Sequence, residues 1–295
     1  MADGEHRAGN PRIVYLNGEF VPEDEARIPI MDRGLLFADA VYEGMGILDG
    51  GIVDVEKHLA RLRRSLGEVS IPEPHTEHGF LEILGELVRR NGVDEGFLYL
   101  HVTRGVAERD YVPAPGLTPT VFGFTQPIHG DGAGAAPTGL TMRSQPDLRW
   151  ARRDIKTTNL LGQVLAQWGA AAAGADEALL VASDGTVTEG GSVSFFPVVD
   201  GEVLVRPLSN DILPGVTRST LLEAIEAEGA PSRERTYTLA EALAADEAMI
   251  TGASSYVEPV VAIDGTPVGD GEPGPLTLRL RATYLSIVRS RLHTA

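Results

Sequence analysis

The stretch that decides the fold is Asp154-Ile155-Lys156-Thr157-Thr158-Asn159-Leu160-Leu161-Gly162, a short polar segment that leads into an apolar helix. Lys156 stands out because the chain has 25 basic residues, and only Lys57 and Lys156 are lysines. Lysine can lose its proton in a desolvated pocket and act as a nucleophilic amine, which arginine cannot do. Most lysines are surface residues, so the interpretation of Lys156 depends on the rest of the chain.

The composition excludes several classes of function. The chain carries 25 basic and 42 acidic residues, a net charge of −17, so nucleic acid is not an expected partner, because proteins that bind it present basic surfaces. Without cysteine there is no disulfide, thiolate nucleophile or Cys-ligated metal. The first residues have no apolar signal-peptide core, and no apolar run is long enough to span a membrane. We therefore expect a soluble cytoplasmic protein without a metal site.

The chain is long enough for two lobes. Residues 127–138 are rich in Gly, Pro and Ala without periodicity, which is typical of a linker. We expect a disordered tail over residues 1–12, a small N-terminal domain over 13–126, an interdomain linker over 127–138 and a larger C-terminal domain over 139–295.

Turn chemistry and periodicity predict the individual elements. An Asn-Gly pair at 17–18 between apolar runs is typical of a type I′ hairpin, and residues 77–91 show helical spacing that ends at Gly92. Other predictions are hairpins over 46–53 and 195–205, strands over 97–103, 120–125, 140–143, 178–182 and 248–251, a helix opening at Thr217, a capping box from Thr238 to Glu241, and a helix over 276–292. The helix after Lys156 carries Leu160, Leu161, Val164, Leu165 and Trp168 on one face. This order predicts an α+β or mixed α/β fold.

The segment Leu213-Pro214-Gly215-Val216-Thr217-Arg218 predicts an anion site on physical grounds. A glycine before a threonine that opens a helix places unpaired backbone N–H groups and a hydroxyl at the positive end of the helix dipole. An ordinary threonine N-cap is the alternative interpretation.

The segment DIKTTNLLGQVLAQ resembles the Schiff-base lysine segment of the fold-type IV (class IV) pyridoxal-phosphate aminotransferases, and the D-amino-acid transaminase branch most closely. Further similarities are TEG at Thr188-Glu189-Gly190, the L-x-G-[IV]-T-R turn from Leu213, K-H-x-x-R-L from Lys57, and F-x-D-x-V-Y-E from Phe37. The resemblance implies a two-lobed fold, with a smaller N-terminal α+β domain and a larger C-terminal mixed β-barrel-like domain with helices.

The resemblance also implies roles for particular residues, with pyridoxal 5′-phosphate as cofactor. Lys156 would form the imine and then act as general base and acid, and Glu189 would keep the pyridine nitrogen protonated. The residues implied on the phosphate side of the cofactor are Arg61, Leu213, Val216, Thr217, Ala253 and Ser254. Those implied on the substrate side are Tyr42, Arg109 and Tyr111.

The chain departs from the family pattern at three places, and the first of them bears on substrate range. Tyr111 stands where D-amino-acid transaminases carry the histidine of an R-x-H carboxylate trap. The run from Gly191 to Ser194 reads GSVS where the branch usually has SSSN. Gly252-Ala253 replaces Ser-Thr, which leaves backbone contacts there.

We therefore expect a transaminase that moves an amino group from a D-amino acid, such as D-alanine or D-glutamate, to a 2-oxo acid such as 2-oxoglutarate or pyruvate, in a ping-pong cycle. Alternatives on the same fold are an (R)-amine transaminase, a branched-chain L-amino-acid transaminase and a 4-amino-4-deoxychorismate lyase. A non-enzymatic acidic binding module is the alternative of another class. The resemblance also implies a homodimer.

Overall fold

The computed structural model describes residues 11–128 and 133–293, which pack as two compact units. Within this range, unit 1 comprises the residues up to 128, Lys156–Thr158 and residues 292–293, and unit 2 comprises residues 133–155 and Asn159–Arg291. The expected tail over 1–12 and linker over 127–138 lie in part outside the described residues, and the expected domain bounds stay a prediction.

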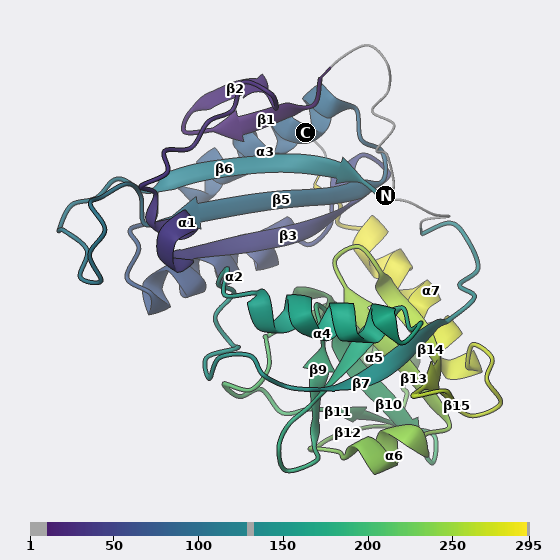
Figure 1. Ribbon diagram of the computed structural model, residues 1–295. Coiled ribbons are helices and arrows are strands. Elements are labelled where there is room, and N and C mark those ends of the chain that lie inside the picture. Colours follow the sequence, from purple (N-terminus) through teal and green to yellow (C-terminus); the bar gives the residue numbers. More distant parts are fainter. Residues whose placement is uncertain (1–10, 129–132, 294–295) are drawn as a thin grey trace. The chain divides into compact units, whose positions relative to one another are not determined.

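Unit 1 is built on a six-stranded antiparallel sheet in the order β2-β1-β6-β5-β3-β4 (Figure 1). Its elements are β1 (Ile13–Leu16), β2 (Glu19–Pro22), α1 (Arg33–Phe37), β3 (Ala40–Leu48), β4 (Gly51–Ile52), α2 (Val55–Glu68), α3 (Glu77–Asn91), β5 (Gly96–Thr103) and β6 (Thr120–Pro127). The first hairpin confirms the prediction from Asn17-Gly18, since both residues have positive φ, 47° and 101°, as a type I′ turn requires.

Helices α2 and α3 cover the sheet of unit 1, with α2 against β3 and α3 against β1 and β6 (Figure 1). Side chains alternate along β5: Leu98 and Leu100 are buried, whereas Tyr99 and His101 are half-buried. Because successive strand residues point to opposite faces, the second pair lies on the face away from the leucines. Strand β3 is longer than the predicted hairpin arm because it pairs with β5 along eight residues of its length, from Ala40 to Ile47.

Unit 2 contains a nine-stranded mixed sheet in the order β12-β11-β10-β13-β14-β7-β8-β9, with β15 paired to β14. Its elements are β7 (Leu140–Pro146), α4 (Leu161–Ala172), β8 (Glu177–Val181), β9 (Val187–Gly190), β10 (Ser194–Val199), β11 (Glu202–Val205), α5 (Val216–Glu228), β12 (Ser232–Glu234), α6 (Leu239–Leu243), β13 (Glu247–Gly252), β14 (Tyr256–Ile263), β15 (Thr266–Pro267) and α7 (Pro275–Arg289). Helices α5 and α7 pack on each other and against β13 and β14, and α4 packs against β7 and β8. The capping box predicted at Thr238 and Glu241 is present.

Helix α4 buries a different face from the one its large apolar side chains suggest. Ala166 and Ala170 are its buried residues, whereas Leu161 and Trp168 are 70% and 69% exposed and Leu165 is 50% exposed. Small side chains let the helix approach β7 and β8 closely, and the large ones face outward. Within the described residues, no helix is long and apolar enough to cross a membrane.

Candidate functional site

The lysine segment belongs to unit 1 because it adds to the edge of that unit's sheet. Tyr42 N donates to the Lys156 carbonyl at 3.0 Å, and Thr157 forms an isolated antiparallel bridge with Val41. This pairing brings the Lys156 side chain to Tyr42: Nζ lies 3.3 Å from the tyrosine Oη and 4.3 Å from the ring centroid. Two predicted site residues, 114 positions apart in the sequence, therefore lie in contact.

Two residues that the sequence analysis missed extend this contact. The Tyr99 ring stacks on the Tyr42 ring with centroids 5.4 Å apart, and Tyr99 Oη lies 3.0 Å from His101 Nδ1. Burial raises the pKa of Tyr99 and lowers the pKa of His101 to about 4, so near neutral pH a neutral tyrosine hydroxyl and a neutral imidazole share this hydrogen bond. Polar aromatic residues alternating with Leu98 and Leu100 were the signal available in the sequence.

Arg61 is held by a buried carboxylate. Its Nε and Nη2 donate to the two oxygens of Glu43 at 2.9 and 2.7 Å, and His58 Nδ1 lies 2.6 Å from the same carboxylate. Burial alone would raise the pKa of Glu43, but Arg61 and His58 outweigh it and lower this pKa to about 2. The bidentate pair sets the orientation of the guanidinium, and Arg61 stays a predicted phosphate ligand.

Arg109 and Tyr111 lie in the segment between β5 and β6. Both are exposed, Tyr111 by 78%, and the Arg109 guanidinium lies over the Phe37 and Tyr111 rings at 5.2 and 5.7 Å. Within the described residues, neither the Arg109 guanidinium nor the Tyr111 hydroxyl has a hydrogen-bond or ion-pair partner. An arginine held by aromatic rings, with no ion-pair partner in the described chain, is suited to bind an anionic group.

Glu189 lies in the sheet of unit 2 beside an arginine that the sequence analysis also missed. Arg149 Nη1 donates to Glu189, while Arg149 Nε and Nη2 donate to Asp147 at 2.9 and 2.7 Å. Leu213 N, another predicted residue, lies 3.3 Å from both Glu189 oxygens. Burial raises the pKa of Glu189, and Arg149 opposes that shift.

The predicted phosphate turn forms the start of α5. Gly215 is the N-cap, and no side chain caps this helix, so its first N–H groups have no intrahelical partner. The helix begins at Val216, and Thr217 lies in its first turn instead of opening it. Ala253 and Ser254 follow β13, and no hydrogen bond in the described chain joins them to Val216 or Thr217.

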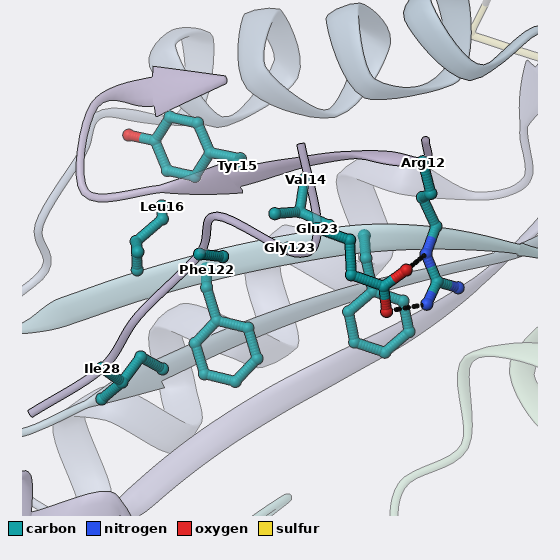
Figure 2. Close-up of a pocket in the computed structure, with 10 residues that line it drawn as sticks. Arg12, Val14, Tyr15, Leu16, Glu23, Ile28, Phe122 and Gly123 are labelled. Atoms are coloured by element: carbon teal, nitrogen blue, oxygen red, sulfur yellow. Dashed lines mark hydrogen bonds and ion pairs between the residues drawn. The ribbon is translucent and has the colours of Figure 1, made fainter. Parts of the chain in front are cut away.

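A cavity of about 240 Å³ lies elsewhere in unit 1. Figure 2 shows Arg12 and Glu23 paired at this cavity, with Phe122 and Ile28 among its apolar lining. None of the predicted site residues lines it, so it does not bear on the roles assigned above.

Comparison with known proteins identifies the class of protein. Residues 40–263 match the model of the class IV amino-transferase family. The chain is 36% identical to a D-alanine aminotransferase from Staphylococcus haemolyticus, over 94% of this chain and 98% of that one. It is 37% identical to a D-alanine aminotransferase from Bacillus licheniformis, over 94% and 97%. The chain therefore belongs to the class IV amino-transferases and is a pyridoxal-phosphate-dependent aminotransferase.

Solved structures agree on this fold. A T.th. branched-chain amino acid aminotransferase with pyridoxamine 5′-phosphate superposes with a TM-score of 0.88 at 29% identity, covering 96% of this chain and 95% of that one. A branched-chain aminotransferase from Thermoproteus uzoniensis with norvaline gives 0.85 at 26% identity, covering 96% of each chain. The predicted two-lobed fold-type IV architecture is confirmed.

The described residues fit the cofactor of this family. Glu189 is a buried carboxylate whose burial disfavours its charge, which a cationic ring nitrogen would offset. The uncapped start of α5 suits a phosphate. Close in sequence to the predicted residues Ala253 and Ser254, the hydroxyls of Thr251 and Ser255 are buried without a hydrogen-bond partner, a state that costs free energy unless a ligand satisfies it.

Proposed function

We propose that this aminotransferase moves the amino group of a D-amino acid, of the D-alanine or D-glutamate class, to a 2-oxo acid such as 2-oxoglutarate or pyruvate. The observation that carries the proposal is Arg109, a guanidinium with no carboxylate partner in the described chain, held over Phe37 and Tyr111. The D-alanine aminotransferases among its relatives support the same substrate class.

Lys156 and Tyr42 would carry the proton transfer. When bound, the cofactor supplies an electron sink for the negative charge that develops at the substrate Cα. Lys156 Nζ would move the proton between this carbon and the cofactor carbon C4′, in one direction in the first half-reaction and in the opposite direction in the second. Tyr42 Oη, 3.3 Å from Nζ, would hold the lysine amine in place during both half-reactions.

Glu189 and the α5 start would hold the two polar ends of the cofactor. Glu189 would face the ring nitrogen, oriented by Arg149 and by the Leu213 N–H. The backbone at Val216 and Thr217 would hold the phosphate, and the Ala253-Ser254 turn would add backbone donors.

Arg109 and Tyr111 would bind the substrate α-carboxylate. An arginine can hold a carboxylate through two parallel hydrogen bonds, whereas tyrosine adds one donor and no charge. A site with one cation in place of two would bind the carboxylate less tightly, so amines that lack this group would be rejected less strongly.

A branched-chain L-amino-acid transaminase is the second candidate, because solved structures similar in fold include such enzymes. Their identities of 29% and 26% are lower than the 36% of the D-alanine relative at similar coverage. Since one fold serves many substrates, the sequence relationship supports the D-amino acid more than the fold supports the L-amino acid.

A half-reaction on the holoenzyme tests the proposal. The enzyme is mixed separately with D-alanine, L-leucine and (R)-1-phenylethylamine, and the visible absorbance band of the cofactor is followed. We expect the fastest loss with D-alanine and a marked slowing in Arg109→Met. If the absorbance band is lost with L-leucine alone, the enzyme belongs to the branched-chain class. If the band is lost mainly with (R)-1-phenylethylamine, the enzyme belongs to the (R)-amine class.

We also propose that the protein is a cytoplasmic homodimer, and the apolar side chains that α4 leaves exposed support the dimer. Leu161, Leu165 and Trp168 repeat at helical spacing along α4, and exposed apolar patches of this kind mark interaction surfaces. Trp168→Glu is expected to convert a dimer to a monomer in analytical ultracentrifugation. A wild-type monomer at micromolar concentration would contradict the proposal.

A further inference from the structure

The segment that carries Arg109 and Tyr111 is long, irregular and exposed. Because it forms no helix or strand of its own, its conformation depends on contacts with the rest of unit 1. It runs from residue 104 to residue 119, between β5 and β6, and contains no helix or extended strand. Its first residues are anchored through the backbone: Arg33 N donates to the Gly105 carbonyl at 2.9 Å, and Val106 forms a bridge with Asp32. These contacts end before Arg109 is reached.

Beyond that point, the described part of the chain anchors the segment through the buried side chain of Arg33. Arg33 Nη1 donates to the Asp110 carbonyl at 2.5 Å, and Nη2 donates to the Tyr111 carbonyl at 3.2 Å. The third contact of the guanidinium, from Nε to Asp39 at 2.8 Å, ties it to the end of α1. The Arg33 side chain is only 4% exposed, so its charge is desolvated and its hydrogen bonds are strong.

The same arginine also orders the side chains of this segment. Its guanidinium lies 4.8 Å from the Phe37 ring centroid, and that ring is in turn 5.2 Å from the Arg109 guanidinium and 5.6 Å from the Tyr111 ring. Arg33 therefore holds the backbone between Arg109 and Tyr111 and supports the ring on which both side chains rest.

We propose that Arg33 is a positioning residue that sets substrate specificity by holding Arg109 and Tyr111 in the geometry that binds a carboxylate. This inference rests on the proposed role of Arg109. Arg33 itself acts through the two carbonyls and Phe37. Without Arg33, the segment would become ordered only when the substrate carboxylate binds, and the entropy lost in that ordering would oppose binding. Substrate binding would therefore weaken more than the rate at saturation falls.

The chain offers a matched control in Arg104. This arginine also pairs with Asp39, through Nε at 2.7 Å, and also donates to two carbonyls, those of Val69 and Ser70 at 2.6 and 2.8 Å. Because Arg33 and Arg104 share Asp39, removal of either one leaves the carboxylate paired with the other. Arg33→Met and Arg104→Met therefore each remove one of the two arginines paired with Asp39. They differ in the part of the segment that loses its anchor, which is residues 110 and 111 for Arg33 and the first residue for Arg104.

The first readout is amide hydrogen exchange of the holoenzyme without substrate. Arg33→Met is expected to speed exchange in peptides covering residues 108–113 about tenfold, and Arg104→Met to leave these peptides unchanged. Equal exchange in wild type and Arg33→Met, or equal acceleration in both variants, overturns the proposal. Arg33→Lys, which keeps the charge but cannot form the two-carbonyl fork, is expected to fall between them if Arg33→Met folds poorly.

The second readout is the half-reaction with D-alanine and with (R)-1-phenylethylamine, which has no carboxylate. Arg33→Met is expected to raise the D-alanine concentration needed for half-maximal rate about tenfold while the rate at saturation and the response to the amine stay near wild type. If Arg109→Met weakens D-alanine binding and Arg33→Met does not, the positioning role is wrong. If Arg109→Met has no effect, the proposed carboxylate site fails, and the exchange data still decide whether Arg33 holds the segment.

Discussion

Glu43 in unit 1 and Glu189 in unit 2 are both buried carboxylates that contact an arginine, yet their pKa values shift in opposite directions. Glu43 receives two donors from Arg61 and lies beside His58. Glu189 shares its arginine, because Arg149 gives its Nε and Nη2 to Asp147 and only Nη1 to Glu189.

The opposite pKa shifts distinguish Glu43, whose charge is balanced within the protein, from Glu189, whose charge is not fully balanced. The environment of Glu43 favours the charged form, because Arg61 and His58 balance the negative charge of the carboxylate. The environment of Glu189 disfavours the charged form, so the carboxylate gains from a further cation. A protonated pyridine nitrogen is such a cation, so this difference supports the proposed role of Glu189 at the cofactor.

The largest expected effect on stability comes from Glu43→Gln. The free energy of unfolding of the apoenzyme should fall by about 3 kcal/mol, since the substitution leaves Arg61 buried without its counter-charge. Urea unfolding measures the change. Glu86→Gln is the control, because the pKa of Glu86 is also lowered to about 2 by Arg89 and Arg90 but on an exposed surface; a comparable loss there would show that burial is not the cause.

Glu189→Gln should give the opposite outcome. We expect about a hundredfold loss of half-reaction rate with D-alanine, since the ring nitrogen loses its carboxylate partner, and little change in urea unfolding, since the site does not favour the charge. Stopped-flow absorbance and apoenzyme unfolding measure the two. A variant that unfolds readily but keeps its activity would reverse the comparison.

Arg149→Met should act through Glu189. Without Arg149, which opposes the effect of burial, the pKa of Glu189 should rise further, so less of the ionised form is present at pH 7 and activity should fall about tenfold there. Activity should partly recover as the pH is raised. Arg153→Met is the control: it lies 3.5 Å from Asp147 and forms no ion pair with Glu189 in the described chain, so an equal effect would contradict the assignment.

The smallest expected effect is the pH dependence of apoenzyme stability, in which the two carboxylates have opposite signs. The Glu43 contribution is present above pH 4.5 and is lost as the pH falls toward 2, because its pKa is lowered on folding. The Glu189 contribution is present below pH 4.5 and is lost as the pH rises through its raised folded pKa. Unfolding curves between pH 2 and 7 give the free energy of unfolding of wild type minus that of each variant, Glu43→Gln and Glu189→Gln. The comparison would be falsified if these two differences changed with pH in the same direction.

Much of the local structure follows from the sequence. Asn17-Gly18 adopts the positive φ of a type I′ turn, Gly92 ends α3, and Thr238 caps α6 with Glu241. These signals act within a few residues through backbone dihedral angles and short-range hydrogen bonds, so no knowledge of the distant chain is needed. The class of enzyme was also available, because Lys156 and the motifs around it are contiguous runs.

Other features were decided only by the tertiary structure. The apolar face of α4 was visible in the sequence, but helical periodicity does not say which face meets the sheet, and two alanines allow the closer approach. Arg149 and Arg33 were not predicted as site residues because their partners are distant in the sequence. Arg149 contacts Glu189, 40 residues away, and Arg33 contacts Asp110, 77 residues away.

The sequence by itself therefore determined the fold class and the cofactor family, because these depend on local patterns and short motifs. The tertiary structure decided which carboxylate is neutralised by the protein, which arginine orients Glu189, and that Lys156 lies against Tyr42. The physical reason is that pKa shifts and side-chain orientation depend on burial and on partners brought together by sheet register, and neither is encoded in the residues next to the group concerned.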